Sequence, residues 1–228
     1  MTLAPTTALI LEGPFIMGDD DHLPDERPAH RVHISPFRLA VLPVTNAEYA
    51  SFIDATGQNA PKFWDDARFN AADRPVVGVT WFDAVGYCEW ISSVTSARYR
   101  LPTEAEREKA TRGGIDGTDF PGGDEPPDGG RFAQDAPRPV GLSGPNGYGL
   151  FDMAYNVHEW CSDWYDQAYY AVSPARDPTG PATGTRRASR GGAWRHQIKY
   201  NRCAGRSSLP PDFQYNDYGF RVALSVSP

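Results

Sequence analysis

Two segments of the chain combine a helix-start signal with apolar residues at helical spacing. Thr45-Asn-Ala-Glu48 is a capping box, in which Thr and Glu three residues apart bond free amides of the first turn. Tyr49, Phe52 and Ile53 follow it on one helical face. Thr103-Glu-Ala-Glu106 repeats the box later in the chain. The pattern predicts a helix behind each box.

Thr80 can cap a further helix, because an apolar stripe begins directly behind it. The stripe consists of Trp81, Ala84, Val85, Cys88 and Ile91. Gly113-Gly114 is expected to end the helix that begins near Thr103, since glycine is favoured just past a helix C-terminus. The first half of the chain is therefore predicted to contain three helices.

Runs of apolar and β-branched residues predict strands. The expected strands are Leu9–Gly18, His30–Val44, Arg186–Trp194 and Tyr218–Leu224. Asp19–Glu26 is an acidic turn between the first two, and 114–138 is rich in Gly, Asp and Pro and is expected to be a long loop. No repeat or low-complexity linker divides the chain, so 1–228 is predicted to be a single domain.

Composition agrees with short elements joined by loops. The 228 residues include 22 Gly and 21 Pro, together with 6 Trp, 11 Tyr and 11 Phe. Glycine and proline punctuate the chain, and large rings can pack short elements together. The expected fold class is a loop-rich α+β domain.

Charge narrows the range of partners. The net charge is −7, and no dense run of Lys and Arg is present, which argues against a nucleic-acid partner. No apolar run reaches membrane-spanning length, so no membrane partner is expected. The first residues lack the basic and apolar regions of a secretory signal, which predicts a cytoplasmic protein.

The segment 146–160 is the strongest candidate for a binding site. It places Asp152 and Glu159 on either side of a turn rich in backbone carbonyls. Calcium prefers such a mixture of carboxylate and carbonyl oxygens from a short segment. The alternative is that both acids cap local turns.

Several motifs, taken in order, resemble the sulfatase-modifying-factor family, whose founding members are formylglycine-generating enzymes. The motifs are Gly13-Pro-Phe-Ile-Met-Gly18, Pro28-Ala-His-Arg-Val32, Pro43-Val-Thr-Asn46, Pro75-Val-Val-Gly-Val-Thr-Trp81, Tyr87-Cys-Glu-Trp90, Arg100-Leu-Pro-Thr-Glu-Ala-Glu-Arg107, Asn146-Gly-Tyr-Gly-Leu-Phe-Asp152, Asn156-Val-His-Glu-Trp160, Ser189-Arg-Gly-Gly-Ala-Trp194 and Tyr218-Gly-Phe-Arg221. The resemblance covers roughly Leu11 to Ala223. It implies one α+β domain of the formylglycine-generating-enzyme fold, related to C-type lectins and holding structural calcium.

The resemblance also implies a set of calcium ligands. The matching positions are the side chains of Asp152 and Glu159 and the backbone carbonyls of Tyr155 and Val157. A second calcium site of the family uses a loop that is short here, at Gly130–Pro139, so that site is expected to be missing or rebuilt.

Formylglycine-generating enzymes hold Cu(I) on two cysteines five positions apart, and this chain matches one of them. The second position is Cys203, while the first falls on Ile198, which has no lone pair for a metal. The other two cysteines, Cys88 and Cys161, are expected to be buried packing residues. The copper-binding pair is therefore predicted to be incomplete, and conversion of cysteine to formylglycine is not the expected reaction.

Two histidines offer a different set of ligands. His158 stands where active members usually carry Trp, and His196 follows Trp194 on the way to Cys203. Together His158, His196 and Cys203 can form a mixed nitrogen and sulfur site for copper or iron. The alternative is two groove histidines and a small buried thiol.

Polar and aromatic residues late in the chain match the family's substrate groove. They are Trp194, His196, Arg202, Arg206 and Asp217, of which all but His196 are assigned to substrate binding. The candidate catalytic residues are His158, His196 and Cys203. The function expected from these features is an oxygen-dependent oxidoreductase acting on a protein, a peptide, or a small thiol or phenol. The alternative is a non-catalytic, calcium-containing binding module: an inactive paralogue, a lectin-like binder or an inhibitor of a partner protein.

Overall fold

The fold packs three small sheets around helices that begin where the sequence predicts. The computed structural model describes residues 4–126 and 135–226. Helices α1 (Asn46–Thr56), α2 (Trp81–Thr95) and α3 (Glu104–Arg112) each start behind a complete capping box, at Thr45, Thr80 and Thr103. Left-handed Gly57 and Gly113 end α1 and α3. The helix prediction is confirmed.

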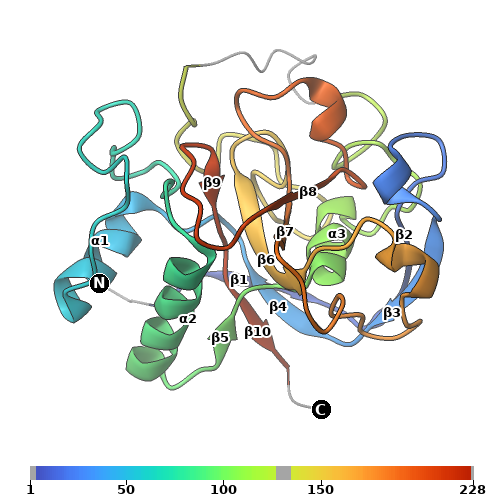
Figure 1. Cartoon of the computed structure of the whole chain (residues 1–228), viewed down its shortest axis with the longest axis horizontal. Helices are drawn as coiled ribbons and strands as arrows, with labels where there is room; N and C mark the ends of the chain where they lie inside the picture. Colours follow the sequence, from blue (N-terminus) through green and yellow to red (C-terminus); the bar gives the residue numbers. More distant parts are fainter. Residues whose placement is uncertain (1–3, 127–134, 227–228) are drawn as a thin grey trace.

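The strands form two four-stranded sheets and one hairpin (Figure 1). The first sheet has the order β1 (Thr7–Ile10), β4 (Phe37–Ala40), β10 (Ala223–Ser225) and β5 (Tyr99–Arg100). The hairpin joins β2 (Gly13–Met17) to β3 (His30–Ile34). The second sheet has the order β8 (Arg206–Leu209), β7 (Arg187–Arg190), β6 (His158–Trp164) and β9 (Tyr218–Gly219), with β9 parallel to β6.

The predicted strands are too long, because turns divide three of them between sheets. Leu9–Gly18 contains the end of β1 and all of β2, and His30–Val44 contains β3 and β4, separated at Ser35-Pro36. Tyr218–Leu224 likewise holds β9 and part of β10, while Arg186–Trp194 shortens to β7. Strand β6 was not predicted, because its first residues belong to the segment 146–160, which was interpreted as a ligand-bearing turn. Within 114–138, the described residues form no named helix or strand, and 127–134 lie outside the described residues.

An aromatic core joins α1 and α2 to the second sheet. Tyr49 stacks on Tyr87 with ring centroids 5.9 Å apart, and the rings of Phe52 and Phe220 pack edge-on against Tyr87. Figure 1 shows α1 and α2 side by side, with the β2–β3 hairpin across the molecule. Large rings thus supply much of the apolar area that such short elements bury. None of the helices in the described part of the chain is long and apolar enough to cross a membrane.

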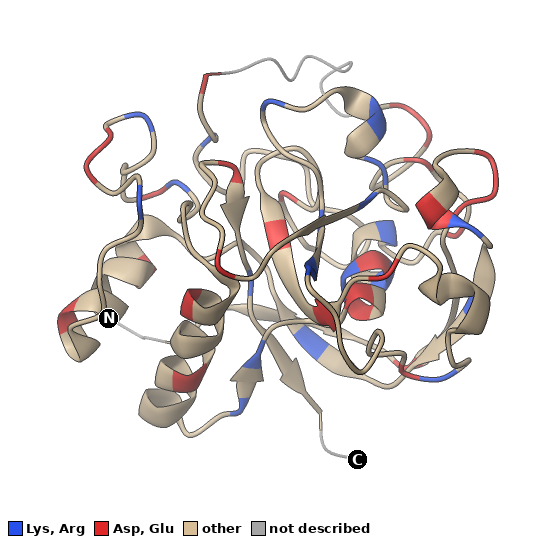
Figure 2. Cartoon of the chain, viewed as in Figure 1, with Lys and Arg blue, Asp and Glu red and all other residues tan. Residues whose placement is uncertain are grey.

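Helix α3 is buried over its whole length although most of its residues are charged. It packs against the β2–β3 hairpin and against β6 and β7. Figure 2 shows acidic and basic residues along this helix, with further charged residues on the elements around it. The charges are neutralised in pairs, including Glu104 with Arg206 and Glu108 with both Arg112 and Arg190. Buried charges of this kind are tolerated when they are paired and hydrogen-bonded.

Candidate functional site

The candidate site lies at the start of β6, where successive side chains point to opposite faces of the strand. His158 opens the strand opposite Tyr218 of β9, and its backbone N–H donates to the carbonyl of Asp217 at 2.8 Å. The His158 and Tyr218 rings lie 4.8 Å apart. Pairing between β6 and β9 therefore places Asp217 beside His158, although the two residues are 59 positions apart in the chain.

His158, His196 and Asp217 form a cluster in this region. The Nε2 atom of His158 lies 2.9 Å from Nδ1 of His196. The Nε2 atom of His196 lies 3.5 Å from Oδ2 of Asp217. Arg195 donates to both Asp217 carboxylate oxygens, at 2.7 and 3.0 Å, and holds that carboxylate in place. The two histidines predicted from the sequence thus meet, with Asp217 as the third member.

Both imidazoles are held in the neutral form. Burial lowers the pKa of His158 well below its usual value, and His196 and Arg195 lower it further. Burial also lowers the pKa of His196, although Asp217 opposes the shift. A neutral imidazole offers one lone pair, either to a proton or to a metal ion. The two imidazoles therefore stay uncharged near neutral pH and keep a lone pair available, with a basicity below that of a free imidazole.

A pocket opens beside the cluster. It has a volume of about 300 Å³ and is lined by His158, His196, Tyr200, Arg206 and Ser207. His158 is buried, whereas the side chain of His196 is 32% exposed, so His196 is the histidine that a molecule in the pocket can reach. Tyr200 and Ser207 were not predicted, because nothing in their local sequence distinguishes them.

Cys203 does not join the cluster, which corrects the predicted nitrogen and sulfur site. It is 2% exposed, and burial raises the pKa of its thiol to about 12. A neutral, enclosed thiol is a poor nucleophile and a poor metal ligand. The groups of three or more ligand-type side chains among the described residues are His158, His196 and Asp217, and separately Asp19, His22 and Glu26. Cys203 therefore matches the alternative of a buried packing residue.

Three residues assigned to substrate binding serve mainly other roles. Arg202 forms a two-pronged ion pair with buried Glu26, at 2.6 and 2.8 Å. Arg206 borders the pocket, but its guanidinium is paired with Glu104 through two bonds of 2.8 Å. Trp194 packs in an apolar cluster with Phe69 and Val77, and its ring N–H donates to a backbone carbonyl. Ion pairing and core packing account for these side chains.

Glu159 points away from the pocket and does not fit the calcium site implied by the resemblance. Its Oε2 accepts from Nε of Arg107 at 2.8 Å and from Nε of Arg221 at 2.6 Å, and its Oε1 accepts from Nη2 of Arg221 at 2.7 Å. Burial alone would raise the pKa of Glu159, but the two guanidinium groups outweigh that effect and the pKa falls. Two fixed positive charges on one carboxylate leave no favourable place for a divalent cation.

Arg107 reaches toward carbonyls of the same turn. Its Nη2 donates to the carbonyl of Met153 at 3.0 Å. A Cβ atom placed on Gly191 would lie 3.1 Å from that Nη2 and 3.5 Å from the carbonyl oxygen of Val157, so these groups share one small space. The guanidinium of Arg107 therefore supplies positive charge where a metal ion was expected.

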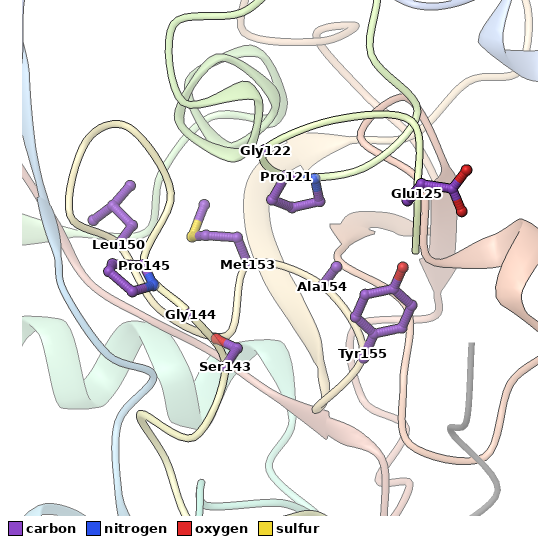
Figure 3. A pocket seen from close by; sticks show the side chains of 10 residues that line it. All are labelled: Pro121, Gly122, Glu125, Ser143, Gly144, Pro145, Leu150, Met153, Ala154 and Tyr155. Atoms are coloured by element: carbon purple, nitrogen blue, oxygen red, sulfur yellow. The ribbon is translucent and has the colours of Figure 1, made fainter. Parts of the chain in front are cut away.

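Asp152 follows the turn-capping alternative. Its carboxylate accepts from the backbone N–H of Gly141 at 2.5 Å and of Ser143 at 3.4 Å. Its own N–H donates to the Ser143 hydroxyl at 2.5 Å. Tyr155 has a left-handed backbone and lines a separate pocket of about 220 Å³ (Figure 3). Leu150, Met153 and Ala154 make much of that pocket apolar, and Glu125 lies at its edge.

Comparisons with known proteins agree with the fold. Residues 1–226 match the family model described as "Sulfatase-modifying factor enzyme 1-like domain". The chain is 36% identical to the formylglycine-generating enzyme of Streptomyces coelicolor, over 92% of this chain and 86% of the relative. It is 28% identical to the solved structure of PvdO from Pseudomonas aeruginosa, with a TM-score of 0.87, covering 99% of this chain and 96% of the other.

Other relatives are longer proteins. The chain is 37% identical to a protein named serine/threonine-protein kinase pkn1 from Chlamydia pneumoniae, over 96% of this chain. It spans 38% of the length of that relative. It also matches the hercynine oxygenase of Mycolicibacterium smegmatis at 32% identity, over 84% of this chain and 55% of the relative.

The fold and the site define a loop-rich α+β domain with a pocket lined by two histidines. The chain belongs to the sulfatase-modifying-factor family, as the motifs of the sequence indicate. Its structure has the fold of formylglycine-generating-enzyme-like proteins.

Proposed function

We propose that this protein is an oxidoreductase-type member of its family that uses the histidine pocket. The proposed substrate is a side chain of a protein or peptide, or a small molecule, that carries a thiol or a phenol. The observation that carries the proposal is the 2.9 Å contact between the His158 and His196 rings at the wall of a pocket. The names of two relatives, a formylglycine-generating enzyme and a hercynine oxygenase, support oxidative chemistry in the family.

His196 is assigned the role of proton acceptor. A thiol or phenol must lose its S–H or O–H proton when it is oxidised, and a neutral imidazole within hydrogen-bond reach can take that proton. Asp217, next to the far nitrogen of His196, stabilises the imidazolium that forms. In the overall reaction, two thiols lose their S–H protons and two electrons to form a disulfide bond, or a dihydric phenol loses two O–H protons and two electrons to form a quinone, and O₂ takes the two electrons and two protons to form H₂O₂.

The pocket favours an uncharged substrate group. Arg206 at its wall is paired with Glu104, and Arg195 behind it is paired with Asp217. Each guanidinium therefore already has its counter-ion, and an anionic substrate would have to displace a buried partner. Tyr200, which is 40% exposed, offers a ring against which a phenol can stack.

The test measures oxygen uptake and H₂O₂ with a panel of phenols, thiols and peptides containing Cys-x-Pro-x-Arg. His196→Ala should lower the rate by about 100-fold or more, as expected for the loss of a general base. Cys203→Ala is the matched control and should keep the rate within a few-fold. An aldehyde product that forms on the peptide with copper and disappears in Cys203→Ala would contradict the proposal.

A non-catalytic binding module is the second candidate, and the neutral, buried state of Cys203 together with Ile198 favours it. If this alternative holds, no compound in the panel raises oxygen uptake above the rate measured in buffer. A phenol or peptide should still bind at the pocket, and His196→Ala should weaken that binding.

A further inference from the structure

We propose that His158 and His196 bind one transition-metal ion, with Asp217 orienting His196 from behind. The proposal rests on the proposed function and deepens it by assigning a metal to the same pocket; with the ion bound, the Nδ1 lone pair of His196 coordinates the metal, so His196 is then a ligand and acts as proton acceptor only in the metal-free pocket. Its basis is the geometry of the cluster: two imidazole nitrogens face each other at 2.9 Å, and a carboxylate stands behind one of them.

The separation of the two nitrogens suits adjacent positions around one ion. Metal–nitrogen bonds to histidine are about 2.0–2.1 Å long, so two such bonds at a right angle place the nitrogens roughly 2.9 Å apart. In the absence of metal, the same two atoms share a proton. A bound ion would replace that proton, and His158 would then carry its own proton on Nδ1.

Asp217 fixes the form of His196 that a metal requires. A histidine ligand normally donates its other N–H to a carboxylate or carbonyl, which aims the free lone pair at the metal. Nε2 of His196 faces Asp217 Oδ2 at 3.5 Å, which leaves the Nδ1 lone pair directed at His158. Arg195 holds Asp217 through two hydrogen bonds and prevents the carboxylate from turning away.

The remaining coordination positions face the pocket. His196 is partly exposed, and the pocket of about 300 Å³ beside it has room for water or a substrate atom. Neutral imidazoles favour copper, zinc, nickel or iron over calcium and magnesium, and copper(II) should bind most tightly among the divalent ions.

The second cluster of the chain provides a control. His22 Nδ1 lies 3.0 Å from Asp19 Oδ2, but the third member, Glu26, is paired with Arg202. The His22 side chain is 37% exposed, and Arg202 adds positive charge beside it. This cluster contains one histidine and a carboxylate already paired with Arg202, so His22→Ala should leave tight metal binding unchanged.

The experiment titrates the chelator-treated full chain with Cu(II), followed by calorimetry and by electron paramagnetic resonance. The expected result is one tight site per chain, with hyperfine splitting from two nitrogens. His196→Gln and His158→Gln should each weaken binding at least 100-fold and remove one nitrogen from the spectrum. Asp217→Asn should weaken it about 10–100-fold. Cys203→Ala and His22→Ala should bind as the wild type does.

Two outcomes would overturn the proposal: no saturable site in the wild type, or unchanged affinity and spectrum in the folded histidine variants. Circular dichroism shows whether each variant is folded. If a histidine variant fails to fold, the number of coordinating nitrogens in the electron paramagnetic resonance spectrum of Asp217→Asn gives a second readout. Metal binding is measured without substrate. Tight binding without oxidation would therefore count against the proposed function alone, and oxidation without binding would count against the metal site alone.

Discussion

His158 and Glu159 are neighbours on β6, yet their side chains meet opposite kinds of environment. Glu159 is fully buried and receives hydrogen bonds from two guanidinium groups. His158 is also buried, but its side chain makes one hydrogen bond among the described residues, to His196, and its Nδ1 has no partner there. The Glu159 carboxylate is therefore fully paired, whereas His158 on the other face of the strand keeps a polar atom unsatisfied beside a pocket.

The difference shows which face carries stability and which can carry chemistry. A carboxylate locked between two arginines cannot change partners without a large loss of stability. The two neutral rings share one proton in the hydrogen bond between them. A proton from a substrate, or a metal ion, can take the place of that proton. Unsatisfied buried polar atoms are uncommon in proteins and often mark such functional positions.

The largest effect should come from breaking the paired face. Arg107→Ala removes one partner of Glu159 and leaves that buried carboxylate short of positive charge, so the free energy of unfolding should fall by about 3–5 kcal/mol. Urea denaturation measures this change in the free energy of unfolding. Arg68→Ala, which removes an exposed ion pair with Asp66, is the control and should change little. A loss in Arg107→Ala no greater than in the control would show that the pair does not stabilise the fold.

A smaller effect should appear in the pH dependence of stability. Burial raises the pKa of Asp163, on the same strand, to about 7, and nearby Glu104 adds to the rise. The folded protein therefore binds a proton that the unfolded chain releases near pH 4, and stability falls as pH rises from about 4 to 7. Asp163→Asn should remove this component, on the order of 2 kcal/mol, in denaturation curves at pH 5 and pH 8. Parallel pH profiles for variant and wild type would contradict the assignment.

The pocket face should tolerate substitution better. His196→Gln removes a partly exposed ring and its contact with His158, so the free energy of unfolding should fall by only about 1 kcal/mol. The measurement is the same urea titration used for Arg107→Ala. A decrease in the free energy of unfolding as large as that of Arg107→Ala would contradict the difference between the two faces.

The smallest effect concerns calcium. Because Arg107 and Arg221 already neutralise Glu159, a calcium-selective chelator should shift the Tm of the wild type by less than about 1 °C. A site filled at 100 times its Kd would instead contribute about 2.7 kcal/mol, or several degrees. Adding calcium to Arg107→Ala is the sharper comparison. That variant exposes Glu159 and two carbonyls to a new cation, so its Tm should rise where that of the wild type does not.

Much of the fold follows from local signals. The capping boxes at Thr45 and Thr103 and the cap at Thr80 locate all three helix starts, because a helix N-terminus is satisfied by residues within one turn. Strand ends and sheet membership were less predictable. The break at Ser35-Pro36 sends two strands that look continuous into different sheets, and their partners lie far away in the sequence.

The candidate site was predictable in part. The sequence suggests His158, His196 and Asp217 as site residues, but it places Cys203 with the histidines and Asp217 among the substrate contacts. It also reads Glu159 as a cation ligand, because an acid beside carbonyls looks the same whether its partner is calcium or arginine. Arg107 supplies that charge from 52 positions away, on a helix whose charged sequence gives no sign of burial.

Residue identity and neighbours within a few positions are enough to establish the family, the helix starts and the isoleucine at position 198. Which charges are paired inside, and which polar groups face the pocket, became clear only from the folded structure. Pairing depends on distances between residues far apart in the chain, and a strand reverses the direction of its side chains at every residue. One step along β6 therefore separates a buried ion pair from a candidate reactive site.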